Sequence, residues 1–435
     1  EALDALAPRR RVVEDLVRLL EAKGHATEDI HVAAIVALGL VPLPVVEGAA
    51  ACYCGKCEVE GPATSLQAQV TYLMRYFTDR EGLSPTARAH TATTLAKLIE
   101  AQPAGMPPEL KIGVAELFVD AMERGSREGE AVRESAVLAL GLVGDADKDA
   151  VDEWIRWALS RSVRSQSPMQ QRFALISLAQ VGARPGQGAL AFAAAPGIEG
   201  DLLYQFTGGK KELRPWAALA LGVLGHGLRE ARQALAPAGS LALRNAARSA
   251  RTAEDLGALA LAIGLRGDAE GAALLADKLD QVRAEDARSY VALGLGLAGW
   301  REAVEPLEAA LLDSADEPLL ESQAGLALGL LGQSNVVARL IGSLPQTKSA
   351  PTRAAIAQAL GFLGDQRSIE GLTLLLKENE DRTTDPVRTR AMQALGFLAD
   401  RSMAPWRVAL ASNTNYRAET PTLTCGERSG VLDLN

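Results

Sequence analysis

The sequence predicts an all-α fold, an α-solenoid (superhelix) of about ten two-helix repeats. Three observations support this prediction. A helical pattern at residues 132–145 recurs at intervals of 32 to 40 residues in the second half of the chain, which is typical of two-helix repeats. Aromatic residues are only 4% of the composition, which favours many similar helix contacts over one large core. The chain has 435 residues, and a length of this order is reached without division into separate domains when repeats stack.

Residues 132–145 form the clearest copy of the pattern. Their apolar side chains recur at spacings of three and four along one helix face, at Val132, Ala136, Val137, Leu140 and Val143. Gly144 follows the last turn, where we expect the left-handed conformation that ends many helices. Asp145 is then expected to cap the next helix. The predicted unit is therefore a helix, a tight turn and a second helix.

A glycine inside the first helix of each repeat sets the register. Taking Gly141 as the anchor, the equivalent positions are Gly39, Ala96, Ala179, Gly222, Ala262, Gly296, Gly329, Gly361 and Gly396. A glycine in the middle of a helix costs about 1 kcal/mol relative to alanine. We therefore expect the anchor glycines to mark the places where each repeat packs closely on the next.

An arginine stands eight residues before the anchor in most repeats, at Arg88, Arg133, Arg214, Arg288, Arg353 and Arg388. This row has two interpretations. It could bind anions along one face, or it could form an interior ladder with carboxylates and helix-end carbonyl groups of the adjacent repeat. We prefer the ladder, because arginine pairs well with carboxylates and repeats once in every unit.

Helix starts agree with this register. A capping side chain precedes a proline at Ser84–Pro85, Ser167–Pro168 and Asp385–Pro386, and Glu317–Pro318 is a weaker case. Second helices are expected near residues 149–161, 303–312 and 368–377.

The pattern V-R-x-x-A-x-x-A-L-G-x-x-G-D of residues 132–145 resembles the HEAT repeat, in the variant called the phycobilisome-lyase-type HEAT-like repeat. The resemblance covers residues 28–410. It implies a solenoid, and it implies a function among scaffolds and adaptors above all, with a few enzymes such as the bilin lyases. It also raises a nucleic-acid-binding HEAT-like protein as a third alternative.

Two segments and the tail depart from the repeat. We expect residues 1–411 to form the solenoid, with an inserted edge loop at 41–65 and an irregular segment at 183–212. The irregular segment contains six glycines and two prolines and is expected to be a loose second half of its repeat. Residues 412–435 are expected to be a disordered tail or a cap over the last repeat.

The edge loop holds three of the four cysteines, Cys52, Cys54 and Cys57. Three thiolates in six residues suit a soft ion such as Zn²⁺, but a closed site needs a fourth ligand. Cys425 is separated from the loop by almost the whole array. The alternatives are a disulfide, which would fit an exported protein, and free or redox-active thiols. The compartment therefore stays open, and Zn²⁺ in this loop is the one cofactor we consider.

Charge is unevenly distributed over neighbouring repeats. Residues 202–251 contain eight basic and two acidic side chains, whereas residues 265–324 contain five basic and thirteen acidic ones. A basic contact patch is expected at Lys210, Lys211, Arg244, Arg248 and Arg251. The junction could be a bipolar surface for a protein partner or for self-association, or simply solvated faces with pairing between repeats. The chain has a net charge of −9, so nucleic acid is not expected as a partner.

Catalytic motifs are not found. The sequence contains neither H-E-x-x-H nor G-x-S-x-G. It also contains no His-Glu pair, which the HEAT-like di-iron hydroxylases use in their metal sites. No apolar run reaches the roughly 18 residues that span a bilayer, so a soluble protein is expected. The sequence therefore predicts a non-catalytic protein-interaction scaffold, a subunit of a larger assembly, with contacts at the cysteine loop and at the charge junction.

Overall fold

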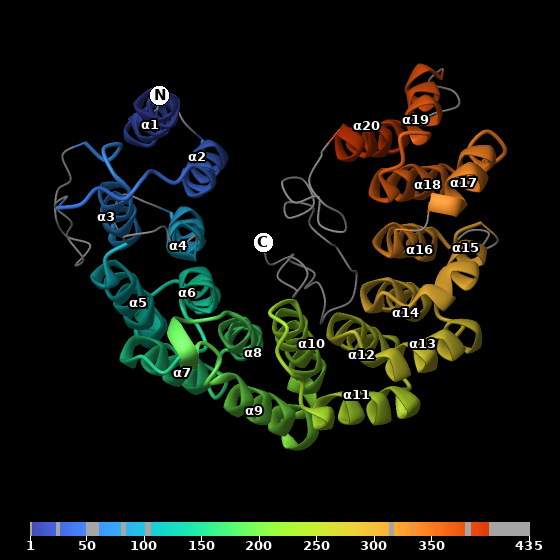
Figure 1. Cartoon of the computed structure of the whole chain (residues 1–435). Helices are drawn as coiled ribbons and strands as arrows, with labels where there is room; N and C mark the ends of the chain where they lie inside the picture. The colour runs from blue at the N-terminus through green and yellow to red at the C-terminus, as the bar shows by residue number, and fades with distance from the viewer. Residues whose placement is uncertain are drawn as a thin grey trace. The chain divides into compact units, whose positions relative to one another are not determined.

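The computed structural model describes residues 2–22, 27–48, 61–79, 84–100, 106–312, 317–332, 334–378 and 384–399 (Figure 1). These residues form twenty α-helices and five short 3-10 helices, and they contain no strand. The predicted all-α solenoid is confirmed. The chain divides into two compact units, Glu1–Ile198 and Glu199–Asn435, which are described in turn.

In unit 1 the first helices of successive repeats pack on one another in chain order. They are α2 (Glu28–Leu40), α4 (Pro85–Glu100), α6 (Glu130–Val143) and α8 (Pro168–Ala183). The second helices form an outer row of α3 (Leu66–Thr78), α5 (Pro108–Glu123) and α7 (Ala150–Ser162). Helix α1 (Ala2–Glu21) precedes the first repeat and packs on α2. The 3-10 helices are η1 (Gly125–Arg127) and η2 (Gly188–Leu190).

Unit 2 repeats the same arrangement over a longer row. Its first helices are α10 (Arg214–Glu230), α12 (Ala253–Arg266), α14 (Glu285–Ala298), α16 (Pro318–Leu331), α18 (Ala350–Leu363) and α20 (Asp385–Ala399). Its second helices are α11 (Pro237–Ser249), α13 (Ala269–Gln281), α15 (Val304–Leu312), α17 (Val337–Ser343) and α19 (Ser368–Lys377). The 3-10 helices are η3 (Lys211–Leu213), η4 (Arg301–Ala303) and η5 (Ser334–Val336). Helix α9 (Ala195–Gly208) contains the boundary between the units.

The two rows differ in how far they are buried. In α12 every residue from 256 to 264 is buried, because other first helices lie on two sides and a second helix covers a third. Its partner α13 buries only a stripe at Gly271, Ala272, Leu275 and Leu279, as expected of an amphipathic helix with one face in water. The first helices therefore form the interior of the unit, and the second helices cover it.

A buried ion pair holds the start of unit 2 together. The side chain of Arg266, at the end of α12, is fully buried and pairs with Glu199 of α9 at 2.8 Å. The same guanidinium donates to the carbonyl oxygens of Leu221 and Ala236, at 3.2 and 3.1 Å. One side chain thus joins α9, α10, α12 and the segment that leads into α11.

The predicted helix starts agree in part with the structure. Ser84 and Ser167 accept hydrogen bonds from the backbone N–H groups of Ala87 and Gln170, at 3.1 and 3.4 Å. At the third predicted start, however, Asp385 is already the first residue of α20. The prediction that Asp385 is the capping residue before the helix was therefore wrong.

Two expectations for the turn after α6 were also wrong. Gly144 is extended, with φ −78° and ψ 159°, and a Cβ there would lie 2.9 Å from Ile155 Cγ2. This glycine therefore makes room for packing and does not supply a left-handed turn. Asp145 does not cap α7, because the helix begins five residues later and Asp149 accepts from the N–H of Asp152 at 2.7 Å.

Left-handed glycines do end four first helices of unit 2. They are Gly267, Gly299, Gly332 and Gly364, with φ between 64° and 68°. These helices end as the repeat pattern predicted for Gly144, since glycine reaches positive φ without a steric cost.

The segment at 183–212 is more regular than expected. It contains η2 and the 14-residue helix α9, so it holds a complete second helix and not a loose one. The connection before α9 is tied to the turn after α6, because Ala146 N–H donates to Arg184 O at 3.0 Å and Ala194 N–H donates to Ala146 O at 2.8 Å.

The first end of the edge loop is held against α3. Gln69 accepts a hydrogen bond from the N–H of Leu43 and donates to the carbonyl oxygens of Leu38 and Val41. Gln67 exchanges two hydrogen bonds with the backbone of Val46. The cysteines Cys52, Cys54 and Cys57 and the tail from 400 onward lie outside the described residues, so the hypotheses about them stay predictions. Among the described helices, none combines the length and apolar character needed to cross a membrane.

Candidate functional site

The anchor glycines lie against the next first helix. A Cβ built on Gly296 would stand 2.5 Å from the Cα of Ala327, and one on Gly361 would stand 2.6 Å from the Cα of Ala394. The Gly222, Gly141 and Gly39 positions would meet Ala262 Cα at 2.7 Å, Ser177 Cα at 2.8 Å and Thr94 Cγ2 at 3.1 Å, and Gly329 meets the Cβ of Phe362. Gly396 is half-buried on α20, the last described helix. These contacts set how closely successive first helices approach.

Three of the six arginines, Arg88, Arg288 and Arg353, reach the segment that precedes the next first helix, and a fourth, Arg388, reaches the segment that precedes its own helix, α20. Arg88 forms a bidentate pair with Glu128, at 2.7 and 3.0 Å. Arg353 pairs with Glu378 at 2.6 Å, and Arg388 donates to the carbonyl oxygen of the same residue at 2.8 Å. Arg288 pairs with Glu317, which directly precedes α16. The arginines thus connect consecutive repeats through carboxylates and through a carbonyl group.

The other two arginines differ. Arg214 is exposed at the start of α10 and forms no ion pair with a described residue. Arg133 approaches only the amide of Gln170, at 3.4 Å, and its Nε is buried without a hydrogen-bond partner among the described residues. The ladder is therefore interrupted within the third repeat.

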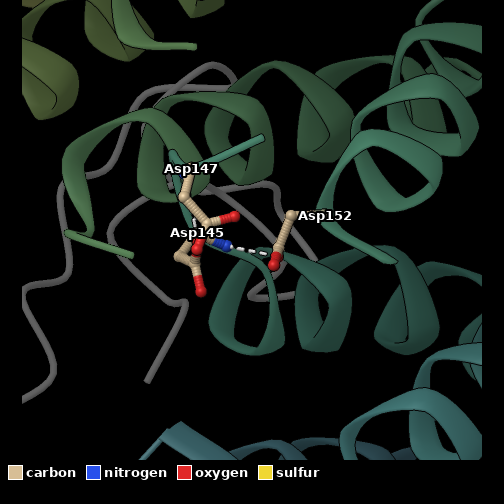
Figure 2. A group of neighbouring side chains, drawn as sticks. All are labelled: Asp145, Asp147 and Asp152. Carbon is tan, nitrogen blue, oxygen red and sulfur yellow. Dashed lines mark hydrogen bonds between the residues drawn. The ribbon is translucent and has the colours of Figure 1, made fainter. Parts of the chain in front are cut away.

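Sequence reasoning did not find a buried acidic cluster at the start of α7. Asp145, Asp147 and Asp152 lie together (Figure 2), with relative exposures of 3%, 8% and 0% and carboxylate oxygens within 4.8 Å of one another. Three carboxylates at this distance could hold a hard divalent cation.

The hydrogen bonds show what the cluster does instead. Lys111 Nζ lies 2.8 Å from Asp145 Oδ2 and 2.6 Å from Asp152 Oδ2. The remaining oxygens of the three carboxylates accept backbone N–H groups, of which Asp145 N–H to Asp152 Oδ1 is drawn in Figure 2. Because every carboxylate oxygen already accepts a donor and an ammonium group occupies the centre, the residues do not fit a metal site.

Burial and pairing shift the pKa values in this cluster. Burial raises the pKa of Asp152 to about 7, against the opposing effect of the hydrogen bond from Lys111. Burial alone would lower the pKa of Lys111, but its two hydrogen bonds to aspartates outweigh that effect and raise it. The lysine therefore stays charged. Its position on α5, 34 residues before Asp145, explains why no local motif revealed the cluster.

An open pocket lies beside the interrupted ladder position. Its volume is about 720 Å³, and residues from the end of α5, from α6, from α7 and from the turn into α8 line it. Its polar lining includes Arg133, Arg161, Arg164, Ser165, Gln166 and Gln170. The pocket belongs entirely to unit 1.

Arginine side chains dominate the charge of this pocket. Glu123 is its one acidic lining residue and pairs with Arg161 at 2.7 Å. Arg164 is exposed and forms no ion pair with a described residue. The guanidinium of Arg161 also lies over the ring of Trp157, 4.7 Å from its centroid, and this tryptophan is 50% exposed. An exposed aromatic side chain therefore lies against one of the arginines that line this pocket.

A half-buried carboxyl group lies near the same turn. The hydroxyl of Ser167 is 3.4 Å from Glu130 and 3.5 Å from Glu134. Burial, followed by the charge of Glu130, raises the pKa of Glu134 to about 7. Glu134 consequently carries only part of its charge at neutral pH.

The predicted basic patch is only partly available. Lys210, Lys211, Arg248 and Arg251 are exposed, on η3 and its start and at the end of α11. Arg244 is half-buried and pairs with Asp268 and with Glu270 of α13. At this position the basic and acidic side chains of neighbouring repeats form ion pairs with each other.

Comparisons with known proteins place the fold. The family model for HEAT repeats matches residues 314–396, and no curated protein matches the sequence. Among solved structures, an engineered protein is 19% identical, with 89% of this chain and 98% of that chain covered and a TM-score of 0.34. The complex of CpcE and CpcF of phycocyanin lyase from Nostoc is 17% identical, with 56% and 94% covered and a TM-score of 0.34. Human deoxyhypusine hydroxylase is 20% identical, with 68% and 96% covered and a TM-score of 0.28.

The family match falls where the repeats are most regular, at α16, α18 and α20 with the helices between them. The same anchor position occurs in all ten described first helices, from Gly39 in α2 to Gly396 in α20. The chain therefore contains HEAT repeats at residues 314–396.

Proposed function

We propose that this chain is a non-catalytic protein-interaction scaffold and works as a subunit of a larger assembly, without a cofactor in its described part. The observation that carries the proposal is the Trp157–Arg161–Glu123 arrangement on the surface of unit 1. Tryptophan and arginine are the residues that most often dominate binding energy at protein interfaces. Here an ion pair and a cation–π contact hold them in place before any partner arrives, which lowers the entropy lost on binding.

Two further observations support an interaction role. Stacked repeats present extended rows of surface side chains, which suits large partners better than small substrates. The buried acidic cluster, which is the best chemical candidate among the described residues, is filled by Lys111, so it contributes to stability and offers no open coordination position.

Affinity co-purification of the tagged full chain from its source cells, with identification by mass spectrometry, tests the proposal. The variant Trp157→Ala should lose its main partners. The matched control Leu190→Ala removes a side chain that is 61% exposed in the same unit and should keep them. Circular dichroism of both variants checks that they fold. An identical protein set from the tagged chain and from the tag alone would refute the scaffold role.

A further inference from the structure

The repeat register shows what the interrupted ladder position lacks. Glu128 stands thirteen residues before the anchor Gly141 and receives both ends of the Arg88 guanidinium. The same spacing before the next anchor, Ala179, reaches Gln166. A neutral amide therefore stands where this register would place the carboxylate for Arg133.

The consequence is visible around Arg133. Its guanidinium has one long hydrogen bond, to Gln170 at 3.4 Å, and a buried Nε without a partner among the described residues. A buried donor that lacks a partner is destabilising. Arg133 forms no ion pair with a described residue, and its charge acts only at a distance, on the neighbouring Glu134, whose pKa it lowers against the effect of burial. The pocket of about 720 Å³ opens at this position, so a group from outside can reach it.

The rest of the lining selects an anion. Arg164 adds a second guanidinium that forms no ion pair with a described residue, and Arg161 adds a third, which Glu123 only partly neutralises. Hydroxyl and amide groups from Ser165 and Gln166 supply neutral donors. Three arginines against one glutamate favour a carboxylate, which arginine can bind through two parallel hydrogen bonds.

We propose that the pocket binds a glutamate or aspartate side chain from an acidic segment of a partner protein, which completes the arginine ladder of the third repeat. The Arg88–Glu128 pair shows that this chain uses a glutamate carboxylate at the equivalent position. The volume exceeds one side chain, and the exposed Trp157, which lies against the lining residue Arg161, offers an apolar surface to the neighbouring residues of the segment. The inference rests on the proposed function and names the chemistry of its partner.

Fluorescence anisotropy of a fluorescein-labelled pentaglutamate peptide with the full chain, at about 0.15 M salt, measures the interaction. The double variant Arg133→Gln/Arg164→Gln should raise the dissociation constant at least about tenfold, the loss of one good charged contact. Arg11→Gln removes an exposed arginine on α1 and should leave it unchanged. Equal affinity for the double variant, or for a pentaglutamine peptide, would overturn the proposal.

The variant Gln166→Glu gives a second, opposite readout. It supplies the missing carboxylate from within the chain, so it should raise the thermal midpoint and weaken pentaglutamate binding together. Unchanged peptide binding with a raised midpoint would contradict the proposal, because the ladder would then be complete without blocking the site. Inorganic phosphate serves as a competitor, and displacement at the same concentration as free glutamate would show a general anion site instead of a peptide site.

The two proposals fail in distinguishable ways. If Gln166→Glu keeps every co-purified partner of the wild-type chain, the scaffold role stands and the pocket is not the contact. If the wild-type chain has no specific partner but still binds pentaglutamate through Arg133, the pocket binds acidic peptides and the scaffold role is wrong.

Discussion

Replacing Gly296 by alanine should destabilise unit 2, although alanine is the better helix former. A Cβ at this position would stand 2.5 Å from the Cα and 3.0 Å from the carbonyl oxygen of Ala327 on α16. These are backbone atoms, so no side chain can rotate away and the two helices must separate. Overpacking of this kind costs about 1 to 3 kcal/mol, whereas the helix preference of alanine returns about 1 kcal/mol. We expect a net loss of up to about 2 kcal/mol.

Gly200 is the matched control for this change. It also lies inside a helix, α9, but a Cβ there would have no heavy atom within 4 Å. Gly200→Ala should therefore stabilise the chain by about 0.5 to 1 kcal/mol. The two substitutions are chemically identical and should have opposite signs.

Urea unfolding followed by helical circular dichroism measures both variants, and hydrogen exchange of α14 and α16 locates the effect. Faster exchange confined to these two helices is expected in Gly296→Ala. A stabilisation of Gly296→Ala equal to that of Gly200→Ala would refute the argument that the anchor glycines permit close approach of neighbouring helices.

Three further predictions concern buried charges. Glu199→Gln should destabilise unit 2 by about 3 kcal/mol in chemical denaturation, because it leaves the buried Arg266 without its carboxylate. Lys111→Met should destabilise unit 1 by about 3 to 5 kcal/mol at pH 7 and by less near pH 4, because Asp152, whose pKa burial raises to about 7, is then protonated, whereas EDTA should not change the midpoint of the wild-type chain. For Glu134 the pKa rises from 4.5 to about 7 on folding, so the folded chain binds more protons in this range and its stability falls as pH rises through it. Glu134→Gln should remove that loss, and its free energy of unfolding should exceed that of the wild type at pH 8 by on the order of 1 kcal/mol after solvent screening, but not at pH 4.

The fold could be predicted from local sequence patterns, because each repeat contains its own signals for where its helices begin and end. The predicted helices near 149–161 and 368–377 match α7 and α19, since caps and apolar spacing act over only a few residues. The prediction of a left-handed conformation at Gly144 was wrong for a related reason. The pattern shows that glycine is required there, but both a left-handed turn and a tight contact require glycine, and only the position of Ile155 separates the two.

The sites were harder to predict because their partners come from other repeats. Asp145 was interpreted from its neighbours in sequence, whereas its partner Lys111 belongs to the preceding second helix. The unusual state of Arg133 could have been recognised from the sequence by comparison with the preceding repeat, because Gln166 stands thirteen residues before its anchor, as Glu128 does. Such a comparison requires knowing which carboxylate pairs with the arginine, and only the Arg88–Glu128 pair in the structure shows this.

The four left-handed glycines of unit 2 have a consequence for how this chain can change in length. Gly267, Gly299, Gly332 and Gly364 end four successive first helices with nearly the same backbone angles. Removing residues 300–332 would therefore join two turns of the same shape, and duplicating that stretch would insert one more turn of the same kind. Since each repeat meets only its neighbours, an in-frame loss or gain between these glycines leaves every other contact of the row in place. One whole repeat can therefore be deleted or inserted at these turns.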